Sequence, residues 1–174
     1  MEIKNNIIIK DNFFNENVLE KIKQDFSKLK FINRSNLDDD NPYQKIYFNV
    51  VLNNEHFAVK EVYKNLEKYF KNIKNLGKSQ HYYFLSTKHT EATPHMDSCY
   101  INCLVYLKGN YLINSGTGFY DKNEDTGECI LNTHVGFKEN RAIIFDSTIY
   151  HASLQFNENC GTRYAMANFF YYET

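Results

Sequence analysis

The chain has 174 residues, a formal net charge of −1 and 43% hydrophobic residues, values that suit one soluble globular domain. The near-neutral charge supplies no basic surface, so we expect neither nucleic acid nor an anionic membrane as a partner. The sequence has no apolar run long enough to span a bilayer, and its first residues lack the apolar core of a secretory signal. These features predict a cytoplasmic protein.

The four cysteines, Cys99, Cys103, Cys129 and Cys160, form no Cys-x-x-Cys pair. A chain of this size needs no disulfide staples, so we expect reduced and mostly buried thiols. The spacing of Cys99 and Cys103 loosely resembles that of a zinc site. No second cysteine pair accompanies it, which argues against structural zinc.

The N-terminal half alternates between strand and helix patterns. Residues 3–14 read as a short strand and a turn, and residues 44–53 as a second strand. Helical spacing of apolar residues covers 15–31, with Asn15 as the expected N-cap, and 56–73. Residues 34–43 are polar, contain three consecutive aspartates and form an expected loop.

After Gly77 the pattern changes to seven short β-rich runs separated by turn residues. The runs are 80–87, 98–107, 116–120, 128–137, 141–146, 148–156 and 162–172. Such a series is typical of a sandwich or barrel. We therefore expect one domain over residues 1–174, mainly β with N-terminal helices (α+β). Residues 1–78 would form a helical support layer and residues 79–174 a β-barrel core.

His95 and Asp97 lie two residues apart just before an apolar run. On an extended chain, residues at i and i+2 point to the same face, so both side chains could bind one ion. The pair is common by chance, and a surface histidine beside a turn-forming aspartate is the simpler alternative. A third ligand from another strand is needed to decide between them.

His151 follows an apolar strand and a polar turn, and it is the best candidate for that third ligand. Two histidines and one carboxylate can hold iron on one side and leave other positions open. A structural zinc site would be closed instead. His134, in the run 128–137, is the rival third ligand, and it could alternatively line a substrate pocket.

Arg163 opens the last β-rich run, and by alternation it shares a face with Ala165 and Ala167. The two small residues leave room for a ligand, and an inward arginine needs an anion as its partner. A planar guanidinium can bind a carboxylate through two hydrogen bonds. A plain salt bridge, for example with Asp146, is the alternative.

The motifs His95-Met96-Asp97, Tyr106-Leu107, the glycine-containing step at 115–119, His151 and Arg163 occur in an order that resembles a known pattern. It is similar to that of the 2-oxoglutarate- and Fe(II)-dependent dioxygenases, in particular the prolyl-4-hydroxylase-like branch. The opening of the chain also looks like the family's usual strand and amphipathic helix. The resemblance covers most of the sequence and is weakest across residues 31–78.

This resemblance implies a double-stranded β-helix, a jelly-roll-like barrel with iron near its mouth. His95, Asp97 and His151 would be the catalytic residues that bind Fe(II). Arg163 would pair with the distal carboxylate of the cosubstrate 2-oxoglutarate, helped by Tyr106 and Tyr83. O2 would be the second substrate, and succinate and CO2 the co-products.

One departure concerns the loop: the family's usual Gly-Gly pair is Ser115-Gly116 here. The expected reaction is hydroxylation of a peptidyl residue, such as a prolyl residue, or of a small molecule. The alternative is a non-catalytic jelly-roll binding protein derived from the same fold. A nucleic-acid repair enzyme is disfavoured. Relatives of that type carry a second arginine shortly after the first, and no arginine follows Arg163 here. Residues 31–43 and 109–128 are candidate lids, and His89 is a candidate for the pocket entrance.

Overall fold

The computed structural model describes residues 6–33, 47–70, 73, 78–86, 93–111, 114–155 and 161–171. The helices of this part are α1 (Glu16–Phe26) and α2 (Phe57–Leu66). The strands are β1 (Ile7–Lys10), β2 (Ile32–Asn33), β3 (Tyr47–Leu52), β4 (Lys78–Ser86), β5 (Ile101–Lys108), β6 (Ser115–Lys122), β7 (Cys129–Gly136), β8 (Ala142–Asp146), β9 (Tyr150–Gln155) and β10 (Arg163–Tyr171).

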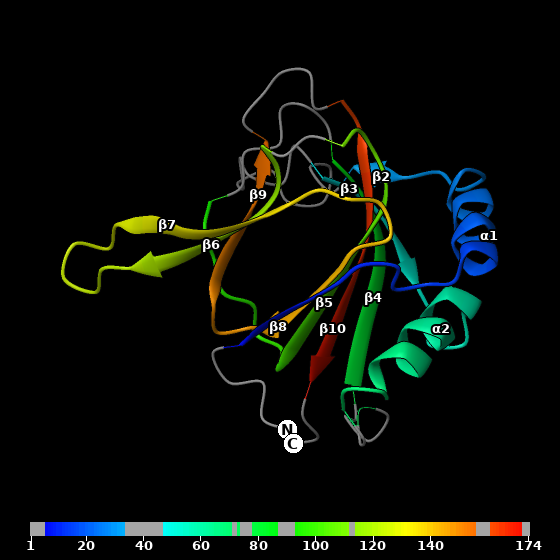
Figure 1. Ribbon diagram of the computed structural model, residues 1–174, viewed down its shortest axis with the longest axis horizontal. Coiled ribbons are helices and arrows are strands. Elements are labelled where there is room, and N and C mark those ends of the chain that lie inside the picture. Colours follow the sequence, from blue (N-terminus) through cyan, green and yellow to red (C-terminus); the bar gives the residue numbers. More distant parts are fainter. Residues whose placement is uncertain are drawn as a thin grey trace.

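The described strands form two antiparallel sheets that face each other (Figure 1). The large sheet has the order β1-β8-β5-β10-β4-β3-β2, and the small sheet has the order β7-β6-β9. Both helices lie against the outer face of the large sheet, and the small sheet lies on the opposite side. The space between the two sheets is where the candidate site is found.

The helical layer forms because each helix has one apolar face. Asn15 caps α1 by accepting a hydrogen bond from the Val18 backbone N–H, as the sequence predicts. Leu19, Ile22 and Phe26 of α1 are buried. They join the core that includes α2 and the outward face of the large sheet. Burying each such side chain stabilises the fold by about 1.5–3 kcal/mol.

A second, smaller core fills part of the space between the sheets. Phe119 of β6 meets Phe145 of β8 with ring centroids 5.1 Å apart, and Tyr106 of β5 meets Phe137 at 4.8 Å. These contacts join the two sheets through their facing side chains. The packing therefore holds β6 against β8, and Phe137, which follows β7, against β5.

The seven β-rich runs expected after Gly77 correspond to β4–β10. The expected division at residue 78 needs correction, because β1 pairs with β8 and β3 pairs with β4 in the same large sheet. The N-terminal segment thus extends the sheet in addition to supplying helices. No helix in the described part of the chain is long and apolar enough to cross a membrane.

Candidate metal centre

The first two ligand candidates lie in the segment that precedes β5, and it is fixed by backbone hydrogen bonds. The backbones of His95 and His151 form an antiparallel bridge, with N···O distances of 3.1 and 2.9 Å. The Asp97 N–H donates to the Ser147 carbonyl at 3.1 Å. The segment is therefore attached to β9 of the small sheet and to the turn before it.

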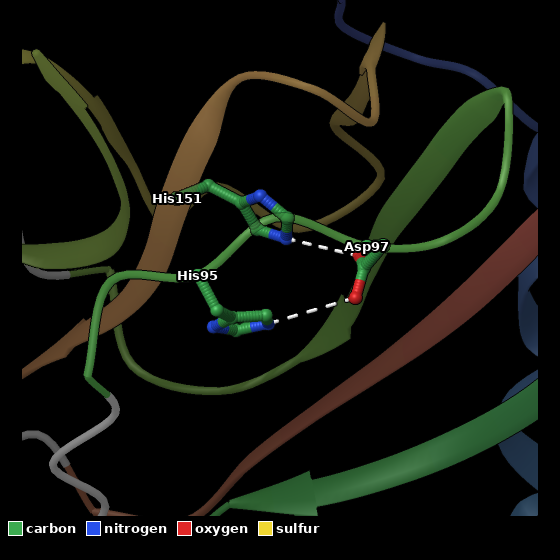
Figure 2. A group of neighbouring side chains, drawn as sticks. All are labelled: His95, Asp97 and His151. Carbon is green, nitrogen blue, oxygen red and sulfur yellow. Dashed lines mark ion pairs between the residues drawn. The ribbon is translucent and has the colours of Figure 1, made fainter. Parts of the chain in front are cut away.

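These hydrogen bonds bring the three side chains together, as Figure 2 shows. His151 Nε2 lies 3.2 Å from Asp97 Oδ2, and His95 Nε2 lies 3.7 Å from Asp97 Oδ1. The two imidazole centroids are 4.7 Å apart. His95, Asp97 and His151 form the one cluster among the described residues in which His, Cys, Asp or Glu side chains could hold a metal ion.

The outer ring nitrogens fix the tautomer of each histidine. His95 Nδ1 lies 3.0 Å from the Thr93 carbonyl, and His151 Nδ1 lies 2.9 Å from the Ile149 carbonyl. A carbonyl oxygen can only accept, so each Nδ1 carries the proton and donates. In the neutral rings each Nε2 then turns a lone pair toward Asp97. Three acceptor atoms directed at one point repel one another unless a cation lies between them.

Asp97 is held in its ionised form. Burial alone would raise the pKa of this carboxyl, but the pKa lies below its usual value, because His151 and His95 in their protonated forms and the Asn102 amide all favour the carboxylate. The Asn102 Nδ2 donates to Asp97 Oδ2 at 2.8 Å. An ionised carboxylate beside two imidazole lone pairs is the donor set that binds a divalent transition metal.

A cavity of about 300 Å³ opens beside this cluster and contains Arg163 in its wall. The Arg163 guanidinium is buried and donates to Ser153 Oγ at 2.6 Å, to Ser115 Oγ at 2.9 Å and to the Gly116 carbonyl at 3.3 Å. These partners orient the planar group. Ala165 lines the same cavity, as the strand alternation predicts.

Tyr106 also lines this cavity, from β5. Its hydroxyl lies 2.7 Å from Thr117 Oγ1 of β6 and donates to the Val135 carbonyl at 3.4 Å. Burial raises the pKa of Tyr106 to about 12, so the hydroxyl stays protonated at neutral pH. A protonated hydroxyl in the wall can contribute a hydrogen bond to a ligand bound by Arg163.

No family model and no curated protein matches the sequence, but solved structures resemble the fold. A prolyl-4-hydroxylase from Pseudomonas putida is 12% identical with a TM-score of 0.62, over 98% of this chain and 94% of that one. HygX from Streptomyces hygroscopicus, with nickel and 2-oxoglutarate bound, is 11% identical with a TM-score of 0.61, over 96% and 83%. A prolyl hydroxylase from Trichoplax adhaerens, bound to a hypoxia inducible factor peptide, is 14% identical with a TM-score of 0.61, over 96% and 84%.

The chain has the fold of the 2-oxoglutarate-dependent oxygenases. The expected fold class is therefore confirmed, with the difference that the described strands form two facing sheets and not a closed barrel. The oxygenase fold accounts for the arrangement of the site. Ligand candidates from the segment before β5 and from β9 meet at one end of the space between the sheets, and Arg163 enters it from β10.

The expectation for Tyr83 is corrected by the structure. Tyr83 lies on the outer face of β4, where its hydroxyl donates to Asp25 Oδ2 of α1 at 3.2 Å and its ring contacts Phe26. The residues of β4 that line the cavity are Phe84 and Ser86. Successive strand residues point to opposite faces, so Tyr83 supports the helical layer and cannot reach a ligand beside Arg163.

None of the other described histidines belongs to the metal cluster. His134 of β7 lies outside the metal cluster and is not part of the cavity lining. Burial, followed by the charge of Arg163, lowers the pKa of His134. His56 caps α2, and the buried His81 contacts Asn168, so both have structural roles. His89 lies outside the described residues.

The structure describes only part of the two candidate lids, 31–43 and 109–128. Most of the range 31–43 lies outside the described residues. The range 109–128 contains β6 and is therefore not a loop along its whole length. Gly116 and Thr117 of β6 line the cavity, so this part belongs to the wall of the site.

Four polar residues of the site have no role in the sequence-based interpretation: Asn102, Ser115, Thr117 and Ser153. For Ser153 and Thr117, the alternation of side chains along a strand could have indicated a place in the site. Ser153 follows His151 by two residues on β9, and Thr117 follows Ser115 by two residues on β6. Single serines and threonines are too common in strands for their type alone to indicate a site.

Proposed function

We propose that this protein is an Fe(II)- and 2-oxoglutarate-dependent dioxygenase. The observation that carries the proposal is the presence of two features in one cavity of about 300 Å³. One is the His95–Asp97–His151 cluster, whose acceptor atoms converge on a point. The other is the buried guanidinium of Arg163. A binding barrel without catalysis has no need for both.

The cluster fits iron by its donor chemistry. Two imidazole nitrogens and one carboxylate suit Fe(II), and three protein ligands leave positions open for other molecules. When bound there, iron would supply the redox chemistry that activates O2 for oxidation of the substrate. The chain would orient the two imidazoles through the hydrogen bonds from each Nδ1–H to the Thr93 and Ile149 carbonyls. Both Nε2 atoms then stay unprotonated and can bind the metal.

Arg163 would bind the distal carboxylate of 2-oxoglutarate, and Tyr106 would add a hydrogen bond. Ser115 and Ser153 support the proposal because their hydroxyl groups hold the guanidinium in place before a ligand arrives. Preorganised donors lose less free energy on binding than donors that must first be ordered. The relatives with nickel and 2-oxoglutarate bound make this cosubstrate the preferred candidate.

The cavity wall favours an uncharged group of the substrate. Beyond the metal cluster and Arg163, the described side chains of the wall carry no formal charge at neutral pH, and they include Phe84, Leu104 and Phe169. A prolyl side chain or an aliphatic part of a small molecule would suit such a wall. We therefore propose hydroxylation of an apolar group, with succinate and CO2 as co-products.

The experiment that tests the proposal is anaerobic titration of the protein with Fe(II) and 2-oxoglutarate, monitored by the visible charge-transfer band of the chelated metal. The wild-type protein should show the band, and His151→Ala should lose it. His134→Ala is the matched control, because it removes a histidine from β7 of the same small sheet without touching the cluster. The control should keep the band.

Release of succinate under air then tests catalysis directly. It should depend on both 2-oxoglutarate and Fe(II), and it should rise when a suitable substrate is added. A folded wild-type protein that shows neither the band nor succinate would refute the enzymatic reading. The alternative of a non-catalytic binding barrel would then be preferred.

A further inference from the structure

Asn102 is a buried polar residue beside the metal cluster that the proposed reaction does not yet use. It lies on β5, where it pairs with Phe145 of β8 and Phe169 of β10. Its side chain is almost completely buried, at 3% exposure, and it lines the cavity. A buried amide between aromatic neighbours is costly unless both of its ends are hydrogen-bonded.

Both ends of this amide have partners near the cluster. Nδ2 donates to Asp97 Oδ2 at 2.8 Å, and Oδ1 accepts from the Cys99 thiol at 3.0 Å. A carboxylate can only accept, so the NH2 group must face Asp97. The orientation of the amide is therefore determined by the network.

Asp97 needs such a partner more than the two histidines do. The terminal torsion of an aspartate is broad, so the carboxylate rotates easily unless an outside group holds it. His95 and His151 are each fixed by a backbone carbonyl at Nδ1. Asn102 provides the corresponding hydrogen bond for Asp97, which gives every ligand candidate an outer partner.

We propose that Asn102 is a positioning residue that holds the Asp97 carboxylate in the orientation needed for metal binding. The inference rests on the proposed function, since it assumes that the cluster binds a metal. Asn102 itself is not a ligand. Its amide acts through Asp97 and sets the affinity of the site for a divalent ion.

A second buried asparagine in the same sheet provides a matched control. Asn168 of β10 is 1% exposed and also has both ends hydrogen-bonded. Its Nδ2 donates to the Cys103 carbonyl at 2.8 Å, and its Oδ1 lies 2.8 Å from His81 Nδ1. Neither contact involves Asp97 or a histidine of the cluster. The same substitution at Asn168 should therefore affect stability but not metal affinity.

The experiment compares Asn102→Leu with Asn168→Leu, since leucine keeps the volume and removes the hydrogen bonds. Binding of Ni(II) to the metal-free proteins is measured by calorimetry, and the rise in Tm on adding Ni(II) is measured in parallel. Asn102→Leu should weaken Ni(II) binding by roughly 10- to 100-fold, the usual effect of removing an outer partner of a metal ligand. It should also reduce the Ni(II)-dependent rise in Tm.

Asn168→Leu should lower the Tm of the metal-free protein and leave the Kd for Ni(II) within about twofold of the wild-type value, because no ligand contact changes. If Asn102→Leu does not fold, Asn102→Ala removes the same hydrogen bond without adding an apolar side chain. A folded Asn102 variant that binds Ni(II) as tightly as wild type would overturn the inference and leave the proposed function intact. A wild-type protein that does not bind Ni(II) would overturn both.

Discussion

Replacing Arg163 with lysine keeps a positive charge in the cavity wall but removes the planar group that the wall is built to hold. Among the described residues, the guanidinium donates hydrogen bonds to Ser153, Ser115 and Gly116. A single ammonium group cannot keep this geometry and also bind a carboxylate through two parallel hydrogen bonds. Loss of one hydrogen bond to a charged group costs about 1.5–3 kcal/mol. On our proposal, the Kd for 2-oxoglutarate should therefore rise roughly 10- to 100-fold, because about 1.4 kcal/mol corresponds to tenfold.

The assay is calorimetric titration of 2-oxoglutarate into the Ni(II)-loaded protein. Arg141→Lys is the matched control, since the Arg141 guanidinium likewise donates hydrogen bonds, to the two carboxylate oxygens of Asp11 and to the Gly136 carbonyl. This control should change stability and leave the affinity for 2-oxoglutarate as it is in wild type. Arg163→Lys with an unchanged Kd and normal Ni(II) binding would show that the distal carboxylate is bound elsewhere.

Three further predictions concern the fold. Gly116→Ala should destabilise the protein by about 3 kcal/mol or more, because Gly116 has φ +157° and the added Cβ would lie 2.0 Å from the Val135 carbonyl oxygen; a wild-type Tm would contradict this. Hydrogen bonds from Arg141 and Lys138 lower the pKa of Asp11 from 3.8 to about 2. The ionised carboxylate therefore stabilises the folded protein fully above about pH 4, and this contribution is lost as the pH falls toward 2. Asp11→Asn should therefore lower the free energy of unfolding at pH 7 by about 1 kcal/mol after screening, and the resulting difference in Tm from wild type should shrink in acid. Burial raises the pKa of the Cys103 thiol, so iodoacetamide should modify Cys103 far more slowly than the partly exposed Cys129, as peptide mass spectrometry would reveal.

The sequence predicted the direction of side chains best in strands whose two faces differ clearly in residue type. On β10 the alternation of Arg163 and Ala165 with Met166 predicts which side chains enter the cavity, and the structure bears this out for the cavity lining and the outer core. The metal cluster could be predicted for the same reason. The side chains of His95 and Asp97 needed only one partner from another strand, and few histidines were available.

Tyr83 shows where alternation gives no answer. It lies in a run of three aromatic residues, so both faces of β4 look apolar in sequence. The register decides the face: Tyr83 pairs with Met166, whose side chain joins the core under the helices. A shift of one residue in the register between β4 and β10 would have pointed Tyr83 into the cavity. Such pairing depends on contacts between distant parts of the chain, which a single sequence does not reveal.

The end of α2 and the pairing of β1 were missed for related reasons. The apolar pattern of 56–73 continues past Leu66, but the helix stops there, and the following backbone makes tighter turns in which Tyr69 and Phe70 both donate to the Leu66 carbonyl. The periodic pattern reports which side chains are buried and not whether the backbone remains helical. Likewise, the apolar residues of β1 indicate a strand but do not say that β8 is its partner.

The three ligand candidates of the cluster come from chain segments next to both sheets. His95 and Asp97 precede β5 of the large sheet, whereas His151 belongs to β9 of the small sheet. The backbone bridge between His95 and His151 already connects the two sheets at this end. A metal ion bound to all three side chains would add a second connection at the same place and remove the repulsion among their lone pairs. The site that we propose for chemistry is thus also the place where the two sheets are joined.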